Sequence, residues 1–283
     1  MNILEKIIAH KKKEVAERKS LYPVKLLEKS IYYNSPCVSL KKYLLRDDKA
    51  GIIAEFKRKS PSKGIINQYA NVERTTIGYM QAGASALSVL TDAEFFGGKN
   101  EDLTVARKFN YCPILRKDFT IDEYQIIEAK SIGADAILLL ANVLSPKEIK
   151  QYSKLAKSLG LEILLEIRDK SEMKSICSDA DCVGVNNRNL KTFETNVKRS
   201  FELAKLIPEE FVKISESGID SAATIRELKK AGYRGFLIGE TFMRNSRPEI
   251  SCADFIKSLL ITNKANYEKD SQINIRNLKI SNS

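Results

Sequence analysis

The chain has 283 residues, of which 43% are hydrophobic and 29% charged, and this is the composition of a globular protein with a large apolar core. It excludes a disordered chain, and the five cysteines, none of them in a C-x-x-C pair, argue against a disulfide-stabilised mini-protein. No apolar run reaches the roughly 18 residues of a membrane span, and the charged N-terminus is unlike a signal peptide. We expect a cytoplasmic protein that does not bind membranes.

The net charge of +11 lies mostly at the two ends of the chain. Residues 1–50 carry 12 Lys and Arg against 6 Asp and Glu, residues 262–283 carry 4 against 2, and the remaining 211 residues carry 31 against 28. Nucleic-acid-binding proteins usually concentrate positive charge in a patch or stripe. The nearly neutral main body has no such stripe, so we expect an anionic small molecule as the ligand and no nucleic-acid partner.

The chain has one histidine, His10, in a lysine-rich stretch where we expect it at the surface. Ser-His-Asp catalysis and H-E-x-x-H metal sites both need a well-placed imidazole. Acid-base chemistry would therefore depend on Lys, Glu, Asp or Tyr, and no metal site is predicted.

Residues 1–50 predict an N-terminal helical extension packed on the main domain. Apolar residues from Ile3 to Ile8 follow the spacing of one helix face. Pro23 suits the first turn of a second helix, and a short third helix is predicted from Leu40.

Residues 51–261 predict a single α/β domain. Eight apolar runs alternate with stretches of helical periodicity, which indicates a buried parallel sheet, and eight strands are the number that closes a (β/α)8 TIM barrel. The runs are Ile52–Phe56, Ala86–Leu90, Pro113–Lys117, Ala136–Leu140, Glu162–Ile167, Cys182–Asn186, Phe211–Glu216 and Gly235–Glu240. An open doubly wound sheet is the alternative, but no G-x-G-x-x-G motif follows the first run. The polar residues 262–283 are predicted to form a C-terminal tail.

Charged residues stand where several predicted strands end. Strand periodicity puts Glu55 and Lys57 on one face of the first strand, and Lys117 and Glu166 follow apolar residues on the corresponding faces of theirs. Barrel enzymes carry their chemistry at the C-terminal ends of the strands. If the apolar neighbours point inward, these charges converge at the barrel mouth and can supply both an acid and a base. A purely structural Lys-Glu network is the alternative interpretation.

Two loops predict a phosphate site. Ser215–Ile219 ends the seventh strand, Ile238–Glu240 ends the eighth, and Ser60–Gly64 after the first strand adds hydroxyls and a lysine. Barrels often bind phosphate at the loops after strands seven and eight, where backbone N–H groups converge. A plain turn is the alternative for each loop.

Taken together, these motifs resemble the indole-3-glycerol phosphate synthase family of tryptophan biosynthesis. The matching stretches are IIAEFKRKSPSKG (52–64), ALSVLTDAEFFGG (86–98), PILRKDFTIDEYQI (113–126), LLEI (164–167), VGVNNRNL (183–190), ISESGI (214–219) and FLIGETFM (236–243). The resemblance covers about residues 1–260. It implies a carboxy-lyase, often monomeric and free of cofactors, that converts 1-(2-carboxyphenylamino)-1-deoxyribulose 5-phosphate to indole-3-glycerol phosphate, CO2 and water.

The resemblance also implies roles for individual residues. Lys117 resembles the family's general acid in ring closure, and Glu166 its second acid-base residue. Lys57 matches the lysine that contacts the substrate carboxylate and transfers a proton during dehydration, and Glu55 the carboxylate that orients the lysines. The implied substrate-binding residues are Phe96 and Phe119 in the anthranilate pocket, Asn186, Arg188 and Glu216 around the middle of the substrate, and Ser60, Ser217, Gly218, Gly239 and Glu240 at the phosphate.

Two other functions fit part of this pattern. Another phosphate-binding barrel enzyme, such as phosphoribosylanthranilate isomerase or the α subunit of tryptophan synthase, would share the phosphate loops without needing Lys57 and Lys117 together with Glu166. A regulatory barrel would keep the phosphate site without turnover, and would have no use for this Lys-Lys-Glu set.

Overall fold

The apolar runs of the sequence form the strands of one parallel sheet that closes on itself. The computed structural model describes residues 2–189 and 192–260. The strands are β1 (Ile52–Phe56), β4 (Ala86–Leu90), β5 (Ile114–Lys117), β6 (Ala136–Leu140), β7 (Glu162–Ile167), β8 (Cys182–Asn186), β9 (Val212–Glu216) and β10 (Tyr233–Ile238). Because β1 pairs with both β4 and β10, the sheet has no free edge and the predicted TIM barrel is confirmed.

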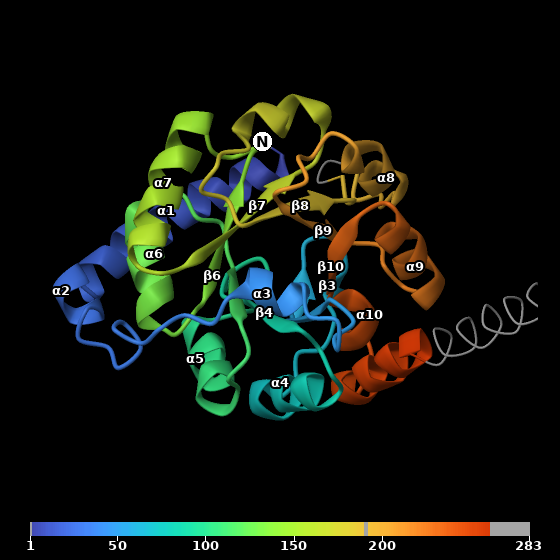
Figure 1. Cartoon of the computed structure of the whole chain (residues 1–283). Coiled ribbons are helices and arrows are strands. Elements are labelled where there is room, and N and C mark those ends of the chain that lie inside the picture. Colours follow the sequence, from blue (N-terminus) through green and yellow to red (C-terminus); the bar gives the residue numbers. More distant parts are fainter. Residues whose placement is uncertain (1, 190–191, 261–283) are drawn as a thin grey trace, which may run out of the picture.

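Helices follow the strands and surround the barrel (Figure 1). They are α4 (Val72–Gln81), α5 (Asn100–Phe109), α6 (Glu123–Ser131), α7 (Pro146–Ser158), the 3-10 helix η1 (Lys170–Ser175), α8 (Lys198–Ala204), α9 (Ala222–Lys230) and α10 (Glu240–Met243). A further helical stretch covers residues 248–260. No helix in these described ranges is long and apolar enough to cross a membrane.

The last strand differs from the sequence prediction. It was predicted to run from Gly235 to Glu240, but β10 begins at Tyr233 and ends at Ile238. Gly239 instead caps α10, and Glu240 is the first residue of that helix. The chain also forms a small hairpin that was not predicted, in which β2 (Lys59–Ser60) pairs with β3 (Gly64–Ile65) directly after β1.

Two apolar layers stabilise the barrel. Alternate strand residues such as Ile53, Leu115 and Leu164 fill its interior, whereas their neighbours pack outward against the helices. Helix α3 (Leu40–Leu44) adds Leu40 and Leu44 to the interior cluster. The inward-facing side chains of the strands are mostly apolar. The last inward-facing residue of each strand, at its C-terminal end, therefore forms the floor of the barrel mouth.

The N-terminal extension packs on the barrel. Helix α1 (Ile3–Leu21) begins with a capping box formed by Asn2 and Glu5. Its far end lies against α6, where Arg18 Nε is 2.5 Å from Glu128 Oε1, and the short α2 (Val24–Leu27) also contacts α6. The chain then reaches α3, which lies in front of the strands in Figure 1.

Two expectations about the chain ends have different outcomes. The expectation of a surface His10 is wrong in part, because the imidazole is half-buried and packs edge-to-face on Phe95 with ring centroids 5.8 Å apart. The tail predicted for residues 262–283 lies outside the described residues.

Candidate active site

A cavity of about 600 Å³ opens at the C-terminal ends of the barrel strands. All the site residues chosen from the sequence line it, namely Glu55, Lys57, Ser60, Phe96, Lys117, Phe119, Glu166, Asn186, Arg188, Glu216, Ser217, Gly218, Gly239 and Glu240. They come together because parallel strands present all their carboxyl ends at one end of a barrel.

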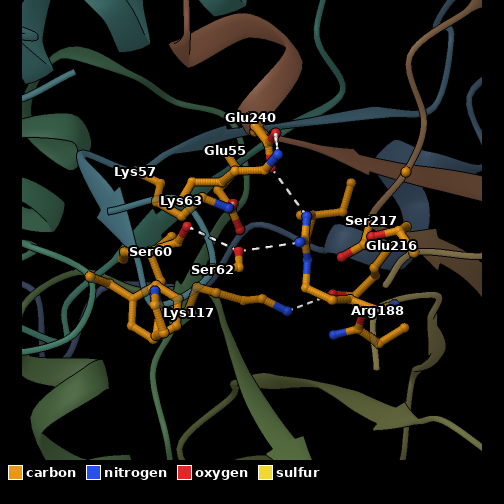
Figure 2. Close-up of a pocket in the computed structure, with 18 of the residues that line it drawn as sticks. Glu55, Lys57, Ser60, Ser62, Lys63, Lys117, Arg188, Glu216, Ser217 and Glu240 are labelled. Carbon is orange, nitrogen blue, oxygen red and sulfur yellow. Dashed lines mark hydrogen bonds and ion pairs between the residues drawn. The ribbon is translucent and has the colours of Figure 1, made fainter. Parts of the chain in front are cut away.

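Lys117 lies between two carboxylates on the floor of the cavity (Figure 2). Its Nζ is 2.5 Å from Glu216 Oε2 and 3.1 Å from Glu166 Oε2. Asn186 Nδ2 donates to the other oxygen of Glu166 at 3.0 Å. The four side chains project from β5, β7, β8 and β9, so the barrel itself fixes their geometry.

Burial and mutual attraction shift the pKa values of this cluster. Burial lowers the pKa of Lys117, but Glu216, Glu166 and Glu55 outweigh it and raise that pKa above its ordinary value. Burial raises the pKa of Glu216 to about 7, against the attraction of Lys117. For Glu166, burial is outweighed by Lys117 and by the Asn186 hydrogen bond, so its pKa is lowered. One lysine thus keeps one carboxylate ionised and leaves the other close to titration at neutral pH.

The resemblance implied a substrate-binding role for Glu216, and the shared contact with Lys117 adds an electrostatic one. Glu216 Oε1 is buried and has no hydrogen-bond partner among the described residues. This carboxylate fits against β8 only because Gly184 has no side chain, since a Cβ there would overlap Glu216 Oε1. A glycine inside an otherwise apolar strand was the available signal.

A second lysine pair lies beside the first. Lys57 Nζ donates to Glu55 Oε1 at 2.5 Å, and Glu55 is nearly fully buried. A Cβ at Gly239 would overlap the Glu55 carboxylate, so glycine at this position lets the loop after β10 approach β1.

The rim carries a bridge between loops. Arg188 donates to Ser62 Oγ at 3.2 Å and to Glu240 Oε2 at 3.1 Å, and Lys63 Nζ lies 3.5 Å from Glu240 Oε1 (Figure 2). These contacts join the loops after β1, β8 and β10. Ser62 and Lys63 belong to the loop singled out in the sequence, although neither was named as a site residue.

An apolar slot forms another wall of the cavity. The rings of Phe96 and Phe119 lie 5.9 Å apart, and Ile3 and Ile7 of α1 also line the cavity. These two isoleucines were not predicted as site residues, because residues 1–50 were expected to form a helical extension apart from the site.

A buried lysine attaches α1 to this wall. Lys11 is fully buried, with its Nζ 3.0 Å from Asp92 Oδ2 and 2.9 Å from Asp118 Oδ1. Asp118 follows Lys117 in the chain, and Asp92 accepts hydrogen bonds from the backbone N–H groups of Phe95 and Phe96. Burial opposes the ionised form of Asp118, but Lys11 and Arg116 lower its pKa to about 2.

The turn after β9 has an unusual backbone. Ser217 has φ 68° and Gly218 has φ 74°, and both residues line the cavity. In the part of the chain that the structure describes, the N–H groups of Gly218 and Ile219 donate to no protein acceptor. Such N–H groups at a barrel mouth suit an anion.

Comparison with known proteins extends the resemblance. A family model described as indole-3-glycerol phosphate synthase matches residues 4–255. An indole-3-glycerol phosphate synthase of Bacteroides thetaiotaomicron is 47% identical over 258 residues, which cover 91% of this chain and 99% of that protein. One from Carboxydothermus hydrogenoformans is 41% identical, with 87% of this chain and 96% of that protein covered.

The fold is also similar to those of solved structures, of which two serve as examples. A tryptophan synthase complex from the hyperthermophile Pyrococcus furiosus has a chain with TM-score 0.55 and 14% identity, covering 75% of this chain and 98% of its own. The 3-hexulose-6-phosphate synthase of Salmonella typhimurium gives TM-score 0.58 and 12% identity, covering 74% and 98%. These likenesses concern the barrel fold alone. With the family match over most of its length, the chain belongs to the indole-3-glycerol phosphate synthase family, whose members are carboxy-lyases of tryptophan biosynthesis.

Proposed function

We propose that the cavity binds 1-(2-carboxyphenylamino)-1-deoxyribulose 5-phosphate and closes its indole ring, with Lys117 as the central acid. The observation that carries this proposal is the position of Lys117 between Glu166 and Glu216 on the cavity floor. The raised pKa of Lys117 keeps it protonated at neutral pH, where it can donate to a carbonyl oxygen.

In the first step, the ring carbon that bears the carboxylate attacks the ribulose carbonyl carbon. One carbon–carbon bond forms, and the carbonyl oxygen takes its proton from Lys117. The bond to the carboxylate then breaks, CO2 leaves, and the electron pair restores the aromatic ring. An ammonium group beside the developing alkoxide stabilises the transition state more than the ground state.

In the second step, the new hydroxyl leaves as water. Lys57 is the acid that we assign to this oxygen, because Glu55 holds its ammonium group in the cavity at 2.5 Å. Glu166, whose pKa is lowered, is ionised and suits the removal of the carbon-bound proton. Lys117 and Lys57 each donate one proton, and Glu166 removes one. The enzyme therefore regains one proton from solvent per turnover, and the substrate carboxylate plus this proton give indole-3-glycerol phosphate, CO2 and water.

The remaining side chains would orient the substrate. Phe96 and Phe119 offer a slot for the anthranilate ring, and Arg188 offers a guanidinium group for its carboxylate. The turn after β9, together with Ser60 and the loop after β10, would hold the phosphate. Holding both ends brings the ring carbon against the carbonyl, which removes much of the entropic cost of closure.

We further propose that one chain forms a complete site and works as a monomer. All the side chains assigned above line one cavity of a single chain. Because phosphorylated intermediates are retained inside cells, we place the reaction in the cytoplasm. Light scattering after size-exclusion chromatography would give the monomer mass if this proposal is correct, and the mass of a larger assembly if it is wrong.

The first test is direct. The purified chain is mixed with the carboxyphenylamino-deoxyribulose phosphate in buffer containing EDTA, and indole fluorescence is followed. We expect turnover that disappears in Lys117→Ala and persists in Lys157→Ala, which removes a partly exposed lysine on α7. Saturable binding without turnover would favour the regulatory barrel. Absence of both would contradict the proposed substrate, and the isomerase substrate would be tried next.

A further inference from the structure

Asn187 is buried between helix α8 and the end of β9 and has no place in the reaction described above. It directly follows Asn186, which contacts Glu166, but neighbouring residues of extended chain point to opposite sides. Asn187 therefore points away from the substrate and is fully buried. A buried primary amide needs partners for two donor hydrogens and for its oxygen.

The structure provides all of these partners. Asn187 Nδ2 donates to the backbone oxygen of Ser217 and to Ser215 Oγ, both at 3.1 Å. Its Oδ1 accepts from Ser200 N at 3.2 Å and from Ser200 Oγ at 2.9 Å. The amide thus connects helix α8 to the end of β9 and to the turn that follows it.

The hydrogen bond from Asn187 to the Ser217 oxygen stabilises a backbone conformation of Ser217 that is unfavourable by itself. Ser217 has φ 68°, in the left-handed region that residues other than glycine seldom adopt. Such a conformation persists only where the surrounding structure holds it. Asn187 supplies a hydrogen bond to the peptide group between Ser217 and Gly218, which is where this backbone could otherwise rotate.

The geometry of that peptide group determines what the bond achieves. In a trans peptide the C=O and N–H bonds point in opposite directions. Asn187 binds the Ser217 oxygen on the side away from the cavity. The N–H of Gly218 in the same peptide group therefore points toward the cavity. Gly218 lines the cavity, and its N–H has no acceptor within the described residues.

We propose that Asn187 is a positioning residue that orients the Gly218 N–H toward the phosphate group of the substrate. This inference rests on the proposed function for the identity of the anion. It assigns to Asn187 a role in phosphate affinity that is separate from the acid-base chemistry of Glu166 and Lys117.

The test compares Asn187→Asp and Asn187→Ala with a control, Ser200→Ala. The aspartate keeps the size and the acceptor but removes both donor hydrogens, and the alanine removes the amide without adding charge. Ser200→Ala removes two bonds of the same buried network, from the Ser200 hydroxyl to Asn187 Oδ1 and between the Ser200 and Ser215 hydroxyls, and leaves the bond to the Ser217 oxygen in place. Circular dichroism and melting temperature report folding for all three.

For both Asn187 variants, we expect KM for the phosphorylated substrate to rise about tenfold, with kcat changed less than about threefold. The inhibition constant of inorganic phosphate should rise by a similar factor. The dephosphorylated substrate should lose nothing, because it makes no contact with the Gly218 N–H. Ser200→Ala should change phosphate affinity less than about twofold.

Several results would overturn the inference. They are unchanged phosphate affinity in the Asn187 variants, an equal effect in Ser200→Ala, a fall in kcat at constant KM, or loss of the fold in both Asn187 variants, which would make the residue structural. Calorimetric titration with inorganic phosphate measures the effect even if the wild-type chain turns out not to convert the proposed substrate. Failure of the proposed function is thereby distinguished from failure of this inference.

Discussion

Three carboxylates and two lysines share the cavity floor. If all five were ionised, one negative charge would remain in excess. Glu166 and Glu216 both face Lys117, and Glu55 faces Lys57. Two carboxylates that share one cation do not ionise equally, and the second to ionise does so at higher pH. The lower pKa makes Glu166 the ionised carboxylate that can act as the base, and the higher pKa makes Glu216 the carboxylate that titrates near neutral pH.

We expect Lys117→Ala and Glu166→Gln to reduce kcat by about 10²–10⁴, with much smaller changes in KM. Both variants remove a proton-transfer group that acts mainly in the transition state. Steady-state kinetics by indole fluorescence would measure the two constants. A rise in KM with kcat unchanged would instead make these residues substrate-binding groups.

The pKa of Glu216 predicts a pH dependence of substrate binding. With Glu216 protonated, the charges of its cluster with Glu55, Lys57, Lys117 and Glu166 cancel. Its ionisation near pH 7 leaves one negative charge beside an anionic substrate. KM should therefore rise between about pH 6 and pH 8, by less than about tenfold in this partly solvated site. Glu216→Gln should remove this part of the profile, whereas a profile that keeps its shape in the variant would assign the titration to another group.

At the scale of secondary structure, α1 is part of the site. Its apolar residues Ile3 and Ile7 line the cavity, and Lys11, one turn further along, is buried between Asp92 and Asp118. The position of this helix therefore affects the loop that carries Phe96 and the residue after Lys117. Helix α1, which the sequence presents as an N-terminal extension, is therefore part of the cavity wall.

Lys11→Met should lower the free energy of unfolding by about 3–5 kcal/mol, because it removes the buried cation that faces Asp92 and leaves Asp118 with Arg116 alone. The matched control is Lys19→Met on the same helix, whose pair with Asp122 is partly exposed and should contribute about 0–1 kcal/mol. Urea denaturation measures both. KM should also rise in Lys11→Met, through displacement of the Phe96 loop. Equal stability of the two variants would show that Lys11 does not anchor α1.

At the scale of the whole molecule, the barrel is closed and its core is continuous through the last described helix. Strand β1 pairs with β10, and Cys252, Ile256 and Leu259 of the final helical stretch are buried in the main core. The family match also ends within this stretch, at residue 255. Among the described residues, those that line the cavity end at Arg244, before this helical stretch.

A chain ending at Ile261 should keep kcat and KM within about twofold of the full chain, with a similar melting temperature, because the family match ends at residue 255 and the described lining of the cavity ends at Arg244. Fluorescence assays and thermal unfolding of the two chains provide the comparison. A marked loss of activity or stability in the shorter chain would mean that residues 262–283 contribute to the fold or to the site.

The sequence by itself determined the barrel and the location of its chemistry. Strand periodicity is a local property, so regularly spaced apolar runs were enough to predict parallel strands. The same periodicity put Glu55, Lys117 and Glu166 on the inward faces of these strands, at their C-terminal ends. The last strand was displaced by two residues because Gly239 and Glu240 directly follow the apolar residues in sequence, whereas the backbone already turns into α10 there.

Only the tertiary structure decided which charges meet. Three contacts join residues from different elements. Two carboxylates share Lys117, Lys11 is buried against Asp118, and Asn187 donates a hydrogen bond to the turn after β9. Their energies depend on distances of a few Å and on exclusion of water, and both arise when the barrel closes and α1 packs on it. A local pattern contains neither quantity, so the sequence located the site and the fold set its electrostatics.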